Sequence, residues 1–218
     1  MTRVMLCGSR GPEDVRLLVE EGAHGIGLIT QVQQNISCRL SLEEAIRLNN
    51  LIPPLVSSIL SITEEDTDKI CQMVELIKPD VVQLHGFNTA EQVSLLKNKL
   101  KIPIIKTLHW EQGPLLEEGD AEQQAVNYIR AGADAILLDS ISSGKLGSTG
   151  VQVPLELARL VRDAIRPAQF ILAGGLNAHN VAQAVEAVKP FAIDAFSSVI
   201  TDGHLDRLKV REFIRSTC

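Results

Sequence analysis

The sequence predicts an α/β protein that folds as a single-domain (β/α)8 TIM barrel spanning residues 1–218. Eight short apolar runs bounded by turn residues alternate with segments of helical spacing, which is the pattern of repeated strand–helix units. Several runs are apolar on successive residues, as expected for parallel strands that are covered on both faces. Alternation alone also fits a doubly wound sheet, and the count of eight favours the closed barrel.

The predicted strands cover residues 3–7, 25–29, 54–60, 80–84, 102–108, 134–139, 168–173 and 192–198. Between them, apolar residues recur at helical spacing over residues 12–21, 41–51 and 154–165. Two helix starts carry capping boxes, in which a hydroxyl and a later carboxylate or amide bind otherwise unpaired backbone amides: Ser41 with Glu44, and Thr89 with Gln92.

Composition excludes several classes of function. The net charge is −6 and the lysines and arginines are scattered, so we expect no nucleic-acid partner. No apolar run approaches the roughly 18 residues of a membrane span, and the N-terminus lacks the pattern of a secretory signal, so we expect a cytoplasmic protein. The four cysteines are widely spaced, which argues against a disulfide framework and a zinc site.

The active site of such a barrel lies at the carboxyl ends of its strands. The polar residues near those ends are Cys7, Ser37, Arg39, Gln83, His85, Lys106, Asp139, the GSTG turn at 147–150, the AGGLN turn at 173–177, Ser197 and Ser198. The two glycine-rich turns fit a phosphate site, and AGGLN is expected to lead directly into a helix whose positive end attracts an anion. Glycine also suits tight connections for geometry alone.

Cys7 and Asp139 end the first and sixth predicted strands, where a base and an acid would face one cavity. The thiol would need a lowered pKa to act as a base, and the carboxyl group a raised pKa to act as an acid. The alternatives are that Cys7 is a small buried apolar residue and that Asp139 caps a turn. Arg39 could bind a substrate carboxylate through two parallel hydrogen bonds; the alternative is that it is a solvated arginine before a helix. His85 fits a hydrogen-bond donor or a structural residue.

At these residues the sequence resembles the phosphoribosylanthranilate isomerase family. The motifs that carry the resemblance are LCG at 6–8, GIGLI at 25–29, SCR at 37–39, VQLHG at 82–86, LLDS at 137–140, GSTG at 147–150 and LAGGLNAHNV at 172–181. The resemblance runs from residue 4 to about residue 214.

The resemblance implies an aldose–ketose isomerase of tryptophan biosynthesis that carries out the Amadori rearrangement of N-(5'-phosphoribosyl)anthranilate. It implies that Asp139 is the general acid that opens the sugar ring and Cys7 the general base that removes a proton from the adjacent sugar carbon. The implied substrate-binding residues are Arg39, Gln83, His85, Gly147, Ser148, Thr149, Gly150, Ala173, Gly174, Gly175, Ser197 and Ser198. No cofactor or metal is implied, because the substrate nitrogen is the electron sink, and the protein is expected to be a monomer or a homodimer.

Three alternatives stay open. A diverged relative would rearrange another aminosugar phosphate with the same acid and base. An aldolase would form a Schiff base on Lys106, which lies in an apolar run. A non-catalytic protein that binds a phosphorylated ligand is the third alternative; it is suggested by Met5, which stands where the family has a lysine.

Residues 109–120 and 30–40 are the expected mobile flaps.

Overall fold

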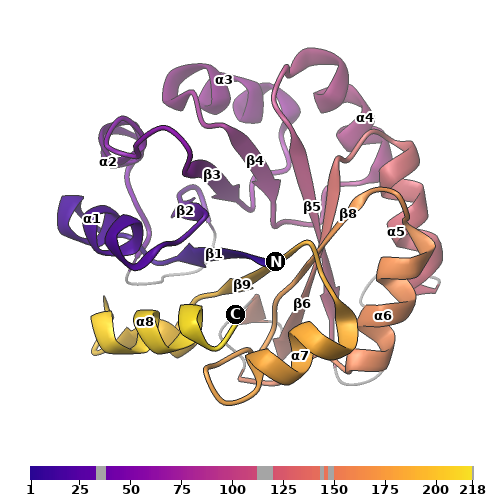
Figure 1. Ribbon diagram of the computed structural model, residues 1–218. Coiled ribbons are helices and arrows are strands. Elements are labelled where there is room, and N and C mark those ends of the chain that lie inside the picture. The colour runs from indigo at the N-terminus through magenta and orange to yellow at the C-terminus, as the bar shows by residue number, and fades with distance from the viewer. Residues whose placement is uncertain (33–37, 112–119, 143–144, 147–149, 218) are drawn as a thin grey trace.

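A computed structural model of the chain describes residues 1–32, 38–111, 120–142, 145–146 and 150–217. Within these residues, eight parallel strands form a closed barrel and the helices surround it (Figure 1). The strands are β1 (Arg3–Cys7), β2 (Gly25–Ile29), β3 (Ser57–Ile62), β4 (Val81–Leu84), β5 (Ile104–Trp110), β6 (Ala135–Ser142), β8 (Gln169–Leu172) and β9 (Ala192–Ala195). Pairing of β9 with β1 and of β5 with β6 closes the ring, which confirms the predicted fold class.

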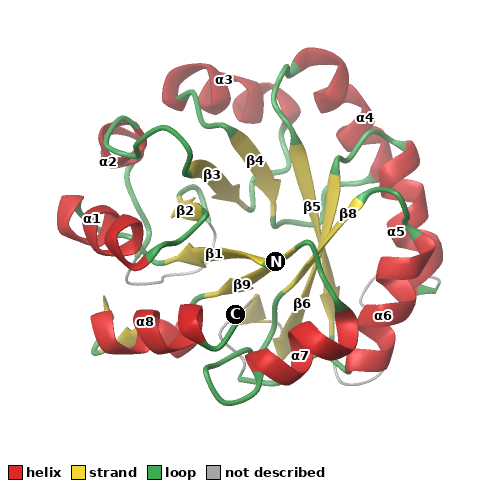
Figure 2. Cartoon of the chain, viewed as in Figure 1, coloured by secondary structure: helices red, strands yellow, loops and turns green. Residues whose placement is uncertain are grey.

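The helices form the outer layer all around the strands (Figure 2). They are α1 (Pro12–Glu21), α2 (Leu42–Asn49), α3 (Thr67–Ile77), α4 (Ala90–Lys99), α5 (Ala121–Arg130), α6 (Leu155–Ala164), α7 (Val181–Val188) and α8 (Arg207–Arg215). Two short hairpins are added at strand ends: β7 (Lys145–Leu146) pairs with β6, and β10 (Ile200–Thr201) pairs with β11 (His204–Leu205). Among the described residues no helix combines the length and apolar character needed to span a membrane.

Two separate apolar clusters show which face of each strand a residue occupies. The larger cluster joins strands to helices and contains Val4 and Leu6 of β1, whereas a smaller one fills the barrel interior and contains Met5 and Cys7. Successive side chains of a strand point to opposite faces, so this alternation extends to every strand of the barrel. It places Asp139 in the interior, because its neighbour Leu138 belongs to the outer cluster.

The local signals for helix starts are confirmed. Ser41 accepts a hydrogen bond from the Glu44 amide while the Glu44 carboxylate binds the Ser41 amide, and Thr89 and Gln92 make the same reciprocal pair. Such a pair satisfies two backbone amides that have no partner within the helix, which fixes where α2 and α4 begin.

Strand limits differ from the prediction in six strands, β3 to β6, β8 and β9, and β6 continues past the predicted end at Asp139 to Ser142. β3 begins at Ser57 rather than residue 54, because Leu55 has a positive φ of 76° after two prolines. β5 continues to Trp110, so residues 109 and 110 belong to the barrel rather than to a flap. β9 ends at Ala195, and the 3-10 turn η1 (Ser197–Val199) follows it. Most of the two predicted flaps, residues 33–37 and 112–119, lies outside the described residues.

Candidate active site

Cys7 is the last residue of β1 and its side chain is buried in the barrel interior. The thiol donates to Asp194 Oδ1 with a sulfur–oxygen distance of 3.5 Å. Burial raises the pKa of Cys7 well above its ordinary value, and the carboxyl groups of Asp194 and Asp139 and the nearby Cys38 thiol act in the same direction. The site therefore favours the neutral thiol unless a neighbour removes its proton.

Asp139 lies across the same interior on β6, three residues before the strand ends at Ser142 rather than at its end as predicted, and is 8% exposed. Burial raises its pKa to about 7, and the charge of Asp194 adds to this rise, whereas a hydrogen bond of 2.8 Å from the Ser140 amide opposes it. A carboxyl group with such a pKa holds its proton near neutral pH and is a suitable general acid.

Asp194 is the site residue that the sequence analysis did not identify. It lies on β9, beside β1 in the barrel, and faces the interior because Ile193 and Ala195 belong to the outer cluster. Burial raises the pKa of Asp194 to about 7, while hydrogen bonds from the Cys7 thiol and the Ala195 amide lower it. A lone aspartate in the otherwise apolar run AIDAF was the signal that could have revealed it.

His85 is held beside Asp139 by a chain of polar side chains. Its Nε2 is 3.9 Å from Asp139 Oδ2, and its Nδ1 is 3.3 Å from Gln83 Nε2, which also donates to Thr107 Oγ1. Gln83 is 1% exposed and lies behind His85 rather than at the surface of the site. Burial and then the charge of Lys106 lower the pKa of His85 to about 4, so its imidazole is neutral at pH 7.

His109 joins this group from β5, although the sequence analysis placed it in a flap. Its Nε2 is 2.8 Å from the His85 carbonyl oxygen, and the two rings meet edge to face with centroids 4.9 Å apart. His85, His109 and Asp139 are the described residues that offer a set of potential metal ligands, with donor atoms within 4.8 Å of one another. Each zinc–nitrogen bond is about 2.1 Å long, so two ligand atoms of one zinc ion lie at most about 4.2 Å apart. Donor atoms of these three side chains that lie up to 4.8 Å apart would have to move closer together to bind zinc.

Lys106 lies on the other face of β5. It is 0% exposed, and its Nζ donates to the carbonyl oxygens of Gly86 and Thr107 and lies 4.9 Å from the centre of the Tyr128 ring. β5 continues for four residues beyond Lys106, so this lysine lies within the strand rather than near its carboxyl end as expected. Its ammonium group is buried between barrel and helices, away from the cavity that holds Cys7 and Asp139.

Arg39 lies at the rim, on the segment that joins β2 to α2, and is exposed. It lines a groove of about 470 Å³ together with Arg10, Leu40 and His204, among others. Its neighbour Cys38 is buried and close enough to Cys7 to affect its pKa. Ser37 of the same motif lies outside the described residues.

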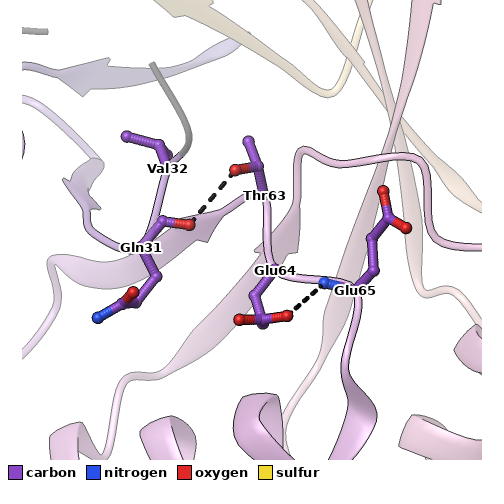
Figure 3. A pocket seen from close by; sticks show the side chains of 5 residues that line it. All are labelled: Gln31, Val32, Thr63, Glu64 and Glu65. Carbon is purple, nitrogen blue, oxygen red and sulfur yellow. Dashed lines mark hydrogen bonds between the residues drawn. The ribbon is translucent and has the colours of Figure 1, made fainter. Parts of the chain in front are cut away.

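A second hollow of about 320 Å³ opens on the same rim, beyond β2 and β3. Gln31, Val32, Thr63, Glu64 and Glu65 line it, and Thr63 Oγ1 donates to the Gln31 carbonyl oxygen (Figure 3). Two glutamates beside this hollow repel an anion, so it is a poor place for a phosphate.

The AGGLN turn packs against the segment that follows the GSTG motif. Gly174 and Gly175 have positive φ values of 80° and 63°. A Cβ atom on Gly175 would lie 2.6 Å from the Gln152 amide nitrogen, so a larger residue cannot occupy this position without moving the backbone. Residues 147–149 lie outside the described residues, and Gly150 is exposed.

The AGGLN turn does not lead directly into a helix, contrary to the prediction. α7 begins at Val181, and a turn over residues 178–180 precedes it. The Asn180 side chain accepts from the Asn177 amide at 2.8 Å, and the Asn177 side chain accepts from the His179 amide at 2.9 Å. Within the described residues, the amides of Ala173 and Asn177 are thus occupied, while those of Gly174 and Gly175 donate to no protein acceptor.

Ser197 and Ser198 follow β9 in the 3-10 turn η1 rather than in a strand. Ser197 is exposed and Ser198 is partly buried. Among the described residues, the Ser198 hydroxyl has no hydrogen-bond partner. Both serines lie at the same end of the barrel as the AGGLN turn, since β8 and β9 are neighbouring parallel strands.

Comparison with known proteins gives a consistent result. Residues 4–216 match the family model for N-(5'-phosphoribosyl)anthranilate (PRA) isomerase. The N-(5'-phosphoribosyl)anthranilate isomerase of Methanosarcina acetivorans is 34% identical over 98% of this chain and 92% of its own length. The corresponding protein of Methanocella arvoryzae is 35% identical over 98% of this chain and 97% of its own length.

Solved structures extend the likeness to the backbone. The crystal structure of phosphoribosyl anthranilate isomerase from Thermotoga maritima superposes with a TM-score of 0.82 at 29% identity, covering 100% of this chain and 98% of that chain. A structure of such an enzyme in complex with reduced 1-(o-carboxyphenylamino)-1-deoxyribulose 5-phosphate gives a TM-score of 0.79 at 28% identity, with the same coverage. The chain therefore belongs to the N-(5'-phosphoribosyl)anthranilate isomerase family.

Proposed function

We propose that this protein isomerises N-(5'-phosphoribosyl)anthranilate to 1-(o-carboxyphenylamino)-1-deoxyribulose 5-phosphate in tryptophan biosynthesis, with Asp139 as general acid and Cys7 as general base. The observation that carries the proposal is that a carboxyl group on β6 with a pKa of about 7 and a thiol at the end of β1 share the barrel interior, close enough for Asp139 to raise the pKa of Cys7. Membership of the family and conservation of the whole barrel support it.

In the first step, Asp139 donates its proton to the ring oxygen of the sugar, the bond from that oxygen to C1 breaks, and a protonated Schiff base forms. The neutral His85 beside Asp139 keeps a cation away from the carboxyl group, which would otherwise lower its pKa. In the second step, the Cys7 sulfur takes the proton from C2, and the electron pair of that bond moves toward the substrate nitrogen. The resulting enolamine becomes the ketone when C1 gains a proton and the C2 hydroxyl loses one.

The glycine turn fixes the orientation that we propose for the substrate. Among the described residues, the amides of Gly174 and Gly175 have no acceptor, so we propose them as donors for the phosphate beyond β8. Glu64 and Glu65 disfavour an anion on the opposite side. We assign the anthranilate carboxylate to the guanidinium of Arg39, which is exposed at the rim and lines a groove there. Ser197 and Ser198 and the GSTG motif at 147–150 complete the phosphate end of this proposal.

The position of Lys106 argues against the aldolase. Its ammonium group faces the Tyr128 ring and two backbone carbonyls, so a carbonyl substrate in the barrel cavity has no path to it. A Schiff-base lysine must also lose its proton, whereas both carbonyl contacts stabilise the protonated amine.

Complementation tests the proposal. The chain is expressed in a tryptophan auxotroph that lacks the isomerase, and growth without tryptophan is the expected result. A Cys7→Ala variant expressed at the same level is the control, and it should not restore growth. Failure of the soluble wild-type protein both to restore growth and to convert the purified substrate would overturn the proposed function. Size-exclusion chromatography of the same preparation distinguishes a monomer from a homodimer. A relative from Thermotoga maritima is described as dimeric.

A further inference from the structure

The chemistry of the Cys7 thiol raises a question that the acid and base roles leave open. A neutral thiol cannot remove a proton from carbon; only the thiolate can. Cys7 is 4% exposed, and no described lysine or arginine contributes to its pKa, so no cation stabilises a thiolate. The site must therefore contain a group that takes the thiol proton when the substrate is bound.

Asp194 is in position to take it. Its Oδ1 is 3.5 Å from Cys7 Sγ, within the range of a sulfur hydrogen bond, and the thiol is the donor. β1 and β9 are adjacent parallel strands with Met5 opposite Asp194, so Cys7 is the next interior residue of β1 and lies diagonal to Asp194, within reach of its carboxyl group. On the other side of Cys7, position 27 of β2 is a glycine and offers no side chain.

We propose that Asp194 is a positioning residue that accepts the Cys7 proton, so that the base of the reaction is the Cys7–Asp194 pair. This inference rests on the isomerase function proposed above. The S–H bond breaks and its proton moves to the Asp194 carboxylate, which leaves a thiolate beside a neutral carboxylic acid. The total charge of the pair does not change, which makes the transfer possible in a buried site where creation of a new charge is costly.

The remaining protons balance over one turnover. The thiolate takes the C2 proton of the Schiff base and becomes a thiol again, while Asp139 has become a carboxylate by opening the ring. When the enolamine becomes the ketone, C1 takes a proton that Asp194 returns through Cys7, and the C2 hydroxyl returns a proton to Asp139. Cys7, Asp139 and Asp194 thereby recover their starting states.

In the proposed mechanism Asp139 starts protonated and Asp194 starts ionised. Asp194 raises the pKa of Asp139, because two buried like charges in one cavity are unfavourable. Both carboxyl groups have a pKa of about 7. The proposal assigns the proton to Asp139, which gives it to the ring oxygen, and the ionised state to Asp194, whose pKa is lowered by the hydrogen bonds from Cys7 and Ala195. The other titratable or charged groups around Cys7 are Cys38, which also raises the pKa of the thiol, and Arg10, whose charge reaches Cys38.

Asp194→Asn separates this role from a merely electrostatic one. Removal of a neighbouring negative charge makes the Cys7 thiol easier to ionise, so an electrostatic bystander predicts unchanged or faster turnover and faster alkylation. The proposal predicts that kcat falls on the order of 10²-fold near pH 7, while alkylation of Cys7 by iodoacetamide in the free enzyme is not slowed. It also predicts that kcat of the variant rises with pH through the alkaline range, because hydroxide must replace the lost acceptor.

Asp134→Asn is the matched control, because Asp134 lies just before the amino end of β6 and pairs with Lys97 at 2.6 Å, far from the cavity. Its kcat should equal that of the wild type. Binding of reduced 1-(o-carboxyphenylamino)-1-deoxyribulose 5-phosphate to Asp194→Asn shows that the cavity is intact. Near-normal kcat in Asp194→Asn, or a fall in kcat with an unchanged pH profile, overturns the inference. An inactive wild type would instead remove the proposed function itself.

Discussion

Gly27 lies directly opposite Cys7 in the pairing of β2 with β1, and a Cβ atom at position 27 would overlap the Cys7 sulfur. The thiol thus occupies space that any other residue at position 27 would fill. Gly27→Ala should force the sulfur out of its place beside Asp194 and lower both the activity and the stability. Overpacking of this kind costs about 1–3 kcal/mol, which a thermal melt should detect. Unchanged kcat in Gly27→Ala would mean that the position of the sulfur does not matter for turnover.

Replacement of the acid or the base should remove turnover and leave the barrel intact. Cys7→Ala and Asp139→Asn should each lower kcat on the order of 10²-fold or more, because each removes one proton transfer. Steady-state kinetics on the purified variants, with circular dichroism as a check on folding, is the measurement. If both variants kept near-normal rates, the assignment of acid and base would be wrong.

Arg39→Ala should act mainly on substrate binding. Arg39 is exposed at the rim and takes no part in the proposed proton transfers, so its loss should remove affinity for the anthranilate carboxylate rather than chemistry. We expect KM to rise at least tenfold, with a smaller change in kcat. Arg47→Ala, on the following helix, is a suitable control with no expected effect. An unchanged KM for Arg39→Ala would contradict its role.

The stability of the protein should fall as pH rises through neutrality because of Asp139. Its pKa is about 7 in the folded protein against 3.8 for an ordinary aspartate, so the folded state binds more protons than the unfolded state between these values. The stabilisation is complete below about pH 4 and is lost as pH rises through about 7. Asp139→Asn has no charge to bury and should melt several degrees above the wild type at pH 8.

Melting curves at pH 4 and pH 8 test this difference. At pH 4 the wild-type carboxyl group is neutral, so the two proteins should differ much less than at pH 8. A wild type that melts at the same temperature as Asp139→Asn at both pH values would contradict a raised pKa for Asp139. The same comparison for Asp194→Asn applies, because burial also raises the pKa of Asp194 to about 7.

Lys106 should prove structural. Lys106→Met leaves the carbonyl oxygens of Gly86 and Thr107 without this donor, and an unsatisfied buried group costs about 1–3 kcal/mol. We expect a lower melting temperature and a kcat within a few-fold of the wild-type value. Borohydride treatment with a carbonyl substrate, followed by mass spectrometry, should give no adduct; an adduct on Lys106 would revive the aldolase.

The sequence predicted the barrel and the location of Cys7 and Asp139 on its first and sixth strands because both depend on local pattern. Apolar runs mark strands wherever they occur, and a polar residue at the end of such a run marks the carboxyl rim. Cys7 and Asp139 carry both signals, and β1 and β2 begin and end at the predicted residues. The capping boxes at Ser41 and Thr89 were predicted correctly for the same reason, because each one is made between residues that lie within four positions of one another in the chain.

The sequence analysis did not place Asp194, His109 and Lys106 correctly, because their placement depends on which face of the strand each side chain occupies. On β1 the inward and outward positions can be counted from Cys7. On β5 every residue around Lys106 is buried, so burial alone does not distinguish the inward face from the outward one. The partnership of Cys7 with Asp194 spans 187 residues and arises only when β9 closes the barrel against β1. Such a contact has no signal in either segment alone.

The fate of the hydrogen at C2 of the sugar tests the central claim most directly. The substrate is prepared with deuterium at C2 and incubated with the wild type, Cys7→Ala and Asp139→Asn, and the product is analysed by mass spectrometry and NMR. C2 of the ketose is a carbonyl carbon without hydrogen, so the label leaves C2 in every turnover. The wild type should give ketose with the deuterium at C1 or exchanged into the solvent, whereas both variants should return substrate that still carries the label at C2. Formation of the ketose from labelled substrate by Cys7→Ala at an undiminished rate would contradict the account.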